Sequence, residues 1–287
     1  MVRRVREGGP GTPPAGATRW AAGAPPRGEW TRREFLALPL ALAAVPAGAA
    51  QSETRTSAYD ASVGILYDAL SFQLAGTIKE SIDRDGGRYE VRLEGQGTGI
   101  VNRGEVTGVL RDGRWAPLRS NSMFLVHGRE FRSQVAYDYA QRTIDYRSRS
   151  ETFFLRRLRV AEDVVRMPDG THVDDVFSAT LNHAEGRWEP QPDGTLRTHV
   201  VRRRRGSNEG VDDVEKAYRA EIVPFVLKVA PDPASGGGTA LFDLSRFSSW
   251  AREDRPARIV FGPDRRPQVI TSSLMLGTSV TIRIASA

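Results

Sequence analysis

Apolar and polar residues alternate with a period of two along most of the chain after residue 51. The clearest run is Arg88 to Glu94, where Tyr, Val and Leu alternate with charged residues, as in a β-strand with one solvent-exposed face. Turn signals rich in Asp and Gly separate the runs, for example at 83–87, 112–113 and 262–264. Further strands are predicted at 65–72, 77–82, 123–126, 131–139, 144–146, 153–160, 196–202, 218–229, 258–261 and 269–284, the first two joined near Ala75-Gly76 and the last interrupted at Gly277.

One segment departs from this period and predicts a helix. Apolar residues recur at helical spacing over 173–185. Thr171 is expected to cap its N-terminus and Gly186 to end it. A second, shorter helix is expected over 241–250. The stripe expected to pack on one face or one mouth of the sheet is Val176, Phe177 and Leu181.

Many short strands with little helix between them predict the fold class. We expect a mainly β protein, with a single curved antiparallel sheet or half-open barrel and one amphipathic covering helix.

Residues 1–50 lack the alternation and predict a segment outside the fold. Arg32-Arg33, followed by Phe35-Leu36, directly precedes the almost charge-free stretch 37–50, which holds the small-x-small site Ala47-Gly48-Ala49. This pattern is typical of a cleaved export signal peptide of the twin-arginine type, cut after Ala49 or Ala50 and recognised by an export translocase. The general secretory route and an uncleaved membrane anchor are the alternatives. Residues 51–287 are then expected to form a single β-rich domain in the periplasm or another extracytoplasmic space.

The net charge and the cysteine content argue against several classes of function. The chain has a net charge of +6, and residues 1–50, with 7 Arg and 3 Glu, carry +4 of it. The remainder has a net charge of only +2, which gives no support to a nucleic-acid partner. The chain has no Cys, so disulfides, thiolate nucleophiles and iron–sulfur clusters are excluded.

Three short motifs occur in a fixed order. They are Ile65-Leu66-Tyr67-Asp68 through Leu74-Ala75-Gly76, then Asp175-Val176-Phe177-Ser178, then a closing hairpin over 259–280 that contains Asp264 and Pro267. Together they resemble the bacterial envelope family catalogued as domain of unknown function thirty-one-oh-eight. The family usually carries an Arg that closes the helix, whereas this chain has Asn182 and His183 near that point. The resemblance implies an exported protein with a curved antiparallel sheet, and it implies no activity and no catalytic residue.

Catalytic and metal-binding motifs are weak throughout. His127, His172, His183 and His199 lack metal-ligand spacing, so we expect no metal site and no cofactor. Ser178 could form a nucleophile constellation with His183 and Asp174 or Asp175, but no G-x-S-x-G elbow surrounds it.

Two charged runs have functional and structural interpretations. The acidic run at 212–215 could bind Ca²⁺, but it lacks the spacing of a calcium loop, which favours a solvated turn. The basic run at 202–205 could contact anionic lipid, lipopolysaccharide or cell-wall polymer. We favour a strand that leaves the sheet into a solvated loop, with its charge partly neutralised by Glu209, Asp212 and Asp213.

The remaining prediction is a binding face. Aromatic and aliphatic residues at period-two spacing are expected to line the concave side of the sheet as a cleft for an apolar or amphiphilic molecule. The protein would then be a non-catalytic binding, carrier or assembly factor, with a lipid, lipopolysaccharide or envelope protein as partner. The alternatives are that these side chains fill a closed core, or that the protein is an envelope hydrolase or lyase without a recognisable motif. The candidate ligand-binding residues are Tyr67, Tyr89, Val91, Leu93, Val135, Tyr137 and Tyr139.

Overall fold

The computed structural model describes residues 52–65, 70–152, 154–206, 209–210, 212–233, 236–248, 251 and 254–286. All of them fall within one compact unit. Several residues of the sequence predictions lie outside the described residues: the leader residues Arg32, Arg33, Phe35, Leu36, Ala47 and Ala49, and the candidate site residue Tyr67.

The described residues form sixteen strands. The strands are β1 (Ser52–Ile65), β2 (Leu70–Asp83), β3 (Arg88–Gly97), β4 (Ile100–Arg111), β5 (Arg114–Val126), β6 (Arg129–Asp138), β7 (Thr143–Glu151), β8 (Leu158–Arg166), β9 (Val173–Asp174), β10 (Glu189–Pro190), β11 (Leu196–Arg203), β12 (Ala220–Asp232), β13 (Gly237–Phe242), β14 (Ala257–Phe261), β15 (Pro267–Ser273) and β16 (Ser279–Ser286).

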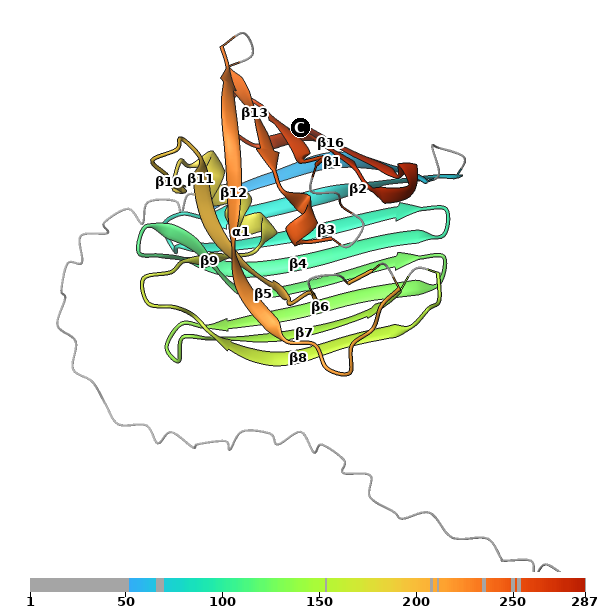
Figure 1. Ribbon diagram of the computed structural model, residues 1–287. Coiled ribbons are helices and arrows are strands. Elements are labelled where there is room, and N and C mark those ends of the chain that lie inside the picture. Colours follow the sequence, from blue (N-terminus) through green and yellow to red (C-terminus); the bar gives the residue numbers. More distant parts are fainter. Residues whose placement is uncertain are drawn as a thin grey trace, which may run out of the picture. The chain divides into compact units, whose positions relative to one another are not determined.

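These strands form a single sheet (Figure 1), in the order β10-β11-β12-β13-β14-β15-β16-β1-β2-β3-β4-β5-β6-β7-β8. The last strand, β16, pairs with the first, with Tyr59 opposite Ile284. Neighbours in this order are antiparallel, and β9 adds a short parallel pairing to β11. The predicted fold class is confirmed: a mainly β protein with one curved sheet.

The two ends of the sheet approach each other without closing into a barrel. Ala161 of β8 and Tyr218, just before β12, form an isolated parallel bridge. The backbone N–H of Ala220 donates to Asp163 Oδ2 at 2.9 Å. Among the described residues no continuous strand pairing joins β8 to β12, so the barrel is half-open, as predicted.

The first hairpin differs from the prediction. The sequence predicted a break near Ala75-Gly76, but β2 runs unbroken through both residues. Gly76 is needed inside the strand because a Cβ there would overlap the Glu94 carbonyl oxygen and the ring of Tyr59. The glycine that reads as a turn is therefore a point of close packing.

The covering helix is α1 (Val176–Ala184), which is shorter than predicted. Asp175 caps it in place of Thr171, while Gly186 follows it with a left-handed φ of +68°. The predicted stripe is wrong in one position, because Val176 is 69% exposed. The buried face consists instead of Ser178, Ala179, Leu181, Asn182 and His183.

The second predicted helix is also wrong. Strand β13 continues to Phe242, and within the described part of 241–250 the only helical element is a single 3-10 turn, η1 (Leu244–Arg246). The interruption predicted at Gly277 is confirmed, because the 3-10 turn η2 (Met275–Gly277) separates β15 from β16. No helix within the described ranges is long and apolar enough to cross a membrane.

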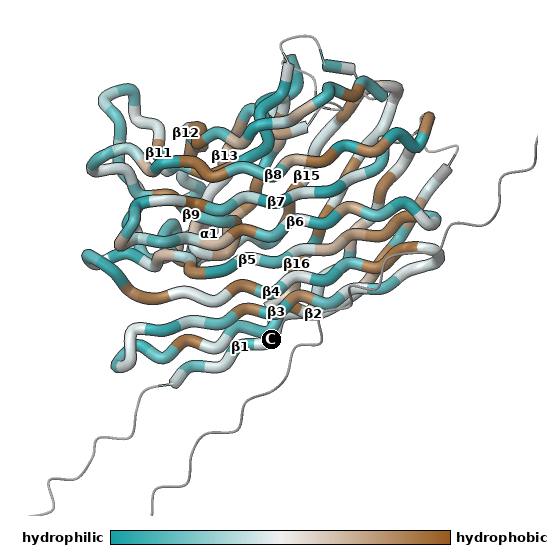
Figure 2. Tube along the Cα trace, turned by 90° about the horizontal axis from the view of Figure 1, so that it is seen from below, coloured by the Kyte–Doolittle hydropathy of each residue, from teal (hydrophilic) through white to brown (hydrophobic). Residues whose placement is uncertain are grey.

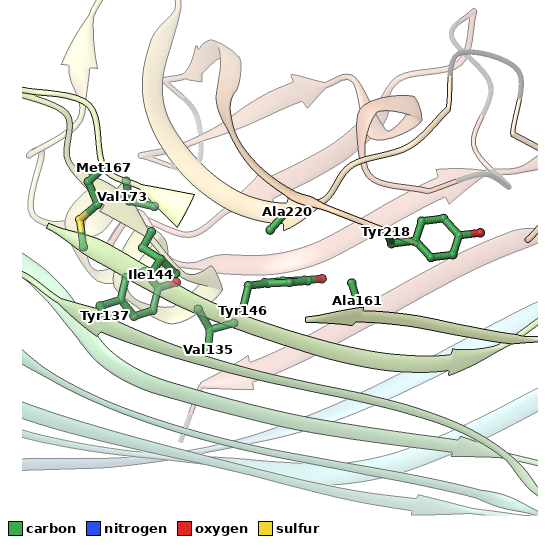
Figure 3. Packing of buried hydrophobic residues seen from close by; sticks show 9 residues of the cluster. All are labelled: Val135, Tyr137, Ile144, Tyr146, Ala161, Met167, Val173, Tyr218 and Ala220. Carbon is green, nitrogen blue, oxygen red and sulfur yellow. The ribbon is translucent and has the colours of Figure 1, made fainter. Parts of the chain in front are cut away.

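Apolar residues alternate with polar ones along the strands (Figure 2), and the buried positions of the strands form the core. One cluster joins β6, β7 and β8 to the start of β12, with Val135 and Tyr146 facing Ala220 (Figure 3). A second cluster packs Leu181 of α1 onto Tyr89, Val91 and Trp115. The helix is therefore enclosed by the curved sheet and anchored on β5.

Candidate ligand-binding cleft

A cleft of about 480 Å³ lies on the concave side of the sheet. It is bounded by β4–β7, by α1 and by the strands from β11 to β14. Apolar and aromatic side chains make up most of its lining. They include Val106, Val135, Tyr137, Tyr146, Phe177, Ala179, Trp188, Phe225, Phe242, Phe247 and Phe261.

A row of small residues explains why this face is hollow. Gly104 of β4 pairs with Ser122 of β5, which pairs in turn with Ser133 of β6. All three line the cleft, and large apolar residues stand beside them on the same face. A Cβ at Gly104 would meet Leu93 no closer than 3.6 Å. The floor of the cleft therefore has room that its small side chains leave unfilled.

The wall opposite this floor is aromatic. Phe225 of β12 makes edge-to-face contacts with Trp188, Phe242 and Phe247, with ring centroids 5.2–5.7 Å apart. The Trp188 indole N–H donates to the Ala179 carbonyl oxygen of α1 at 2.9 Å. Because one end of Trp188 is held by the helix and its ring by Phe225, the wall is fixed relative to α1.

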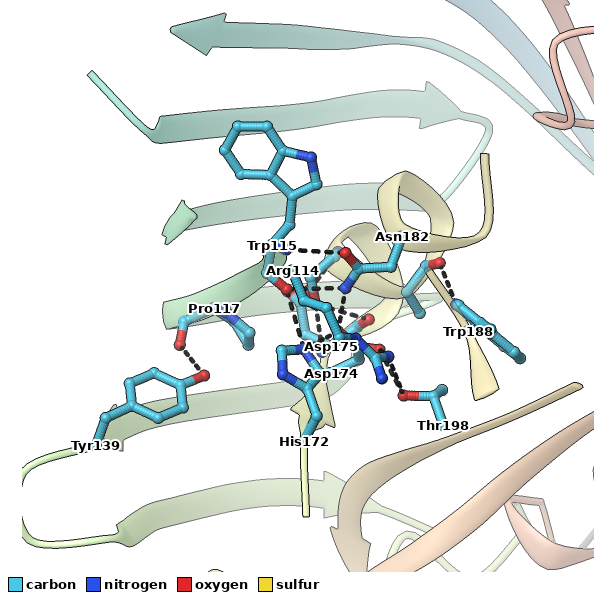
Figure 4. A network of polar contacts seen from close by, with 12 residues as sticks. Arg114, Trp115, Pro117, Tyr139, His172, Asp174, Asp175, Asn182, Trp188 and Thr198 are labelled. Atoms are coloured by element: carbon cyan, nitrogen blue, oxygen red, sulfur yellow. Dashed lines mark hydrogen bonds and ion pairs between the residues drawn. The ribbon is translucent and has the colours of Figure 1, made fainter. Parts of the chain in front are cut away.

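A buried polar network joins α1 to β5 (Figure 4). Asp174 is fully buried and accepts hydrogen bonds from Thr198 Oγ1 at 2.5 Å and from Asn182 Nδ2 at 2.8 Å. Its carboxylate also contacts His172 Nε2 at 3.0 Å and the Arg114 guanidinium at 3.4 Å. The side-chain oxygen of Asn182, Oδ1, accepts a hydrogen bond from the Trp115 backbone N–H at 2.8 Å. Asp174 is thus surrounded by partners.

Asp175, the next residue, has a different environment. Its Oδ1 accepts from the Ser178 backbone N–H at 2.7 Å, which caps α1. Its Oδ2 is buried and has no hydrogen-bond partner. Burial raises the pKa of Asp175 to about 6. The Tyr89 hydroxyl is likewise buried without a partner, and burial, followed by the nearby charge of Asp175, raises the pKa of Tyr89.

The predicted site residues lie in different parts of the structure. Val135 and Tyr137 line the cleft. Tyr89 and Val91 lie beneath α1 in the core, and Leu93 packs in a neighbouring cluster with Tyr59 and Leu74. Tyr139 stacks on Tyr137, and its hydroxyl donates to the Pro117 carbonyl oxygen at 2.9 Å.

Sequence reasoning missed the aromatic wall and Asp175. Trp188, Phe225, Phe242 and Phe261 come from four separate segments, which only the strand order brings together. From the sequence, Asp175 was considered only as part of a motif and as a possible partner of Ser178, not as the cap of the helix. The sequence signal for its role was the spacing of Asp175 and Ser178, which forms a capping box.

The residues considered for nucleophilic chemistry do not converge. Ser178 Oγ accepts from the Asp175 backbone N–H within the capping box. The ring of His183 contacts the Arg265 carbonyl oxygen through Nδ1, stacks on Phe261, and has a pKa lowered by burial. Among the described residues, no three His, Cys, Asp or Glu side chains are grouped as a metal ion would require.

Both charged runs have structural partners. Arg203 pairs with Glu209 at 2.7 Å and lies over the Tyr218 ring, while Arg202 pairs with Glu221 at 2.7 Å. Asp212 accepts from the backbone N–H groups of Phe154 and Leu155, which orders that loop.

No model of a known protein family matches the chain, and no curated protein matches it. Among solved structures, the chain is similar to a β-barrel-like protein of domain of unknown function DUF1849 from Brucella abortus. The two share 10% sequence identity with a TM-score of 0.33, over 82% of this chain and 98% of that one. That protein belongs to a bacterial family of unknown function, and the family is not the one that the sequence motifs resemble.

Proposed function

We propose that this protein is an exported, non-catalytic binding or carrier protein of the bacterial cell envelope, whose cleft holds an apolar or amphiphilic molecule. The observation that carries the proposal is the apolar cleft of about 480 Å³ on the concave face. The proposal includes export through the predicted leader and membership of family thirty-one-oh-eight, which rests on the three motifs alone.

The size and chemistry of the cleft suit such a ligand. Ligand sites in proteins commonly measure about 300–1,000 Å³ and combine apolar walls with a few polar groups. Each methylene group that moves from water into an apolar site contributes about 0.8 kcal/mol. An alkyl chain lying between the small-residue floor and the aromatic wall would therefore be held mainly by burial.

A change on the floor of the cleft tests the proposal. Ser133 is half-buried and lines the cleft, whereas its neighbour Gln134 is exposed on the outer face of the same strand. Ser133→Phe should fill the hollow and weaken binding of the apolar fluorophore N-phenyl-1-naphthylamine by about tenfold or more, whereas the matched control Gln134→Phe should bind like the wild type. Val135 is less suitable, because it belongs to the packed core.

The measurement is a fluorescence titration of the purified protein, with circular dichroism to check that both variants fold. Wild-type affinity in a folded Ser133→Phe variant would show that the cleft is not the binding site. Turnover of a lipid or glycan by the wild type would contradict the non-catalytic part of the proposal and favour the hydrolase or lyase.

A further inference from the structure

The N-terminus of α1 leaves two buried polar atoms without partners. Asp175 is 9% exposed, lines the cleft, and has an unpartnered Oδ2. The hydroxyl of Tyr89 is the second such atom, and it is close enough to Asp175 for the charge of Asp175 to raise the pKa of Tyr89. Buried polar atoms are nearly always hydrogen-bonded, and an orphaned carboxylate oxygen is strongly unfavourable. A ligand group that donates to Asp175 would remove this penalty.

The neighbouring charges select the kind of group that fits. Asp174 also lines the cleft, but its oxygens already receive donors from Thr198, Asn182, His172 and Arg114. Of the cations on the lining, Arg202 is paired with Glu221 through two hydrogen bonds of 2.7 and 3.0 Å. Burial lowers the pKa of His183, which keeps its ring neutral.

The cleft therefore has mainly apolar walls and one carboxylate, that of Asp175, whose Oδ2 receives no hydrogen bond. We propose that Asp175 is the head-group receptor of the cleft, which selects amphiphiles with a hydrogen-bond-donating hydroxyl or ammonium head over those with a carboxylate or phosphate head. This proposal rests on the proposed function, because it requires an amphiphile in the cleft. An anionic head group would face the carboxylates of Asp174 and Asp175, while the Arg202 guanidinium on the lining is already paired with Glu221.

Three probes of equal chain length separate head-group recognition from burial. Dodecylamine, dodecanol and dodecanoate compete with N-phenyl-1-naphthylamine, each below its micelle concentration, at about pH 8, where Asp175 is ionised. The wild type should bind dodecylamine and dodecanol at least about tenfold more tightly than dodecanoate, as a hydrogen bond to a charged group implies.

The decisive variant is Asp175→Asn, because Asn caps a helix as well as Asp does while removing the charge. In this variant the preference should fall to about threefold or less. Asp145→Asn is the matched control: it removes the same charge from a partly exposed position outside the cleft, beside Arg147, and should keep the wild-type preference.

The outcomes distinguish this proposal from the proposed function. If the neutral fluorophore does not bind the wild type, both fail. If it binds and the three heads compete equally, or if dodecanoate binds best, the cleft stands and head-group selection by Asp175 is wrong. A full preference retained in folded Asp175→Asn overturns the assignment to Asp175. The wild-type ranking needs no variant, so the test does not depend on how Asp175→Asn folds.

Discussion

Two adjacent aspartates show how local partners determine the state of a side chain. Asp174 is fully buried and receives donors from Thr198, Asn182 and His172. Asp175 has one oxygen engaged in the helix cap and the other unpaired. Because hydrogen bonding favours the carboxylate form and burial opposes it, Asp175 holds its proton to an unusually high pH.

The raised pKa of Asp175 predicts a pH-dependent stability. Its pKa is about 6 in the folded chain, against an ordinary value of 3.8. Between these values the folded state binds the proton more tightly than the unfolded state, so the free energy of unfolding falls as pH rises through this window. The full penalty, on the order of 3 kcal/mol, is present above pH 6 and absent below pH 4.

Asp175→Asn should therefore be more stable than the wild type at about pH 8, by up to about 3 kcal/mol, and nearly equal to it at about pH 4. Urea unfolding at both pH values measures the difference. A variant that is less stable at the higher pH would show that the ionised Asp175 is stabilised in the fold.

Removing Asp174 should have the opposite effect. Asp174→Ala removes the carboxylate that accepts from Thr198 and Asn182 and that pairs with Arg114, which should lower the free energy of unfolding by about 3–5 kcal/mol. Thr198→Val removes one donor to Asp174 and the hydroxyl oxygen that accepts from Arg114, but it leaves the contacts of Asp174 with Asn182 and His172 in place, so it should cost about 1–2 kcal/mol. Equal losses in urea unfolding of the two variants would mean that Asp174 acts only through Thr198.

At the scale of elements, strand periodicity was a better guide than helical spacing. The alternation in β3 was predicted correctly because one face of that strand is buried and the other is exposed. The helix was predicted three residues too long at its start, because Val173 is apolar and buried but belongs to β9. Helical spacing counts apolar residues and cannot tell which buried surface each one faces.

The corrected face of α1 predicts a graded series of stabilities. Leu181 is 2% exposed and packs on Tyr89 and Trp115, so Leu181→Ala should cost about 2–5 kcal/mol. Phe177 is partly buried and also borders the cleft, so Phe177→Ala should cost less than full burial implies, about 1–3 kcal/mol. The exposed Val176 is the control, and Val176→Ala should change stability by no more than about 0.5 kcal/mol.

Urea unfolding of the three variants tests this order. If Val176→Ala lowered the free energy of unfolding as much as Leu181→Ala does, Val176 would pack against the sheet, as the sequence predicted.

At the scale of the whole molecule, the sequence predicted the fold class and an apolar concave face, but not most of the residues that line the cleft. Alternation and turn signals are local, so they indicated a curved antiparallel sheet. The cleft depends on which strands face one another across the interior. Ser133 and Phe225 lie on strands far apart in sequence, and each reads only as an inward position of its own strand. Two predicted residues, Val135 and Tyr137, border the cleft, whereas Tyr89 and Val91 fill the core beneath the helix.

Export remains a prediction from the leader, and it can be tested on the intact chain. Strand β1 begins at Ser52, so cleavage after Ala49 or Ala50 would remove no residue of the described sheet. Arg32 and Arg33 precede Phe35 and Leu36, and the planar guanidinium makes paired contacts that a Lys ammonium cannot. Changing Arg32 and Arg33 to Lys should therefore keep the protein in the cytoplasm with its leader uncut.

The same leader contains a matched control. Arg3-Arg4 is a second arginine pair, far from the apolar stretch. Changing both residues to Lys should leave export unchanged. Both double variants keep the positive charge of the leader, so a difference between them would come from the position of the guanidinium pair. Cell fractionation followed by mass spectrometry of the N-terminus measures both results. Cleaved, exported protein from the Arg32 and Arg33 variant would favour the general secretory route, since that route requires positive charge but no guanidinium pair. An intact N-terminus on exported wild-type protein would instead favour the uncleaved anchor.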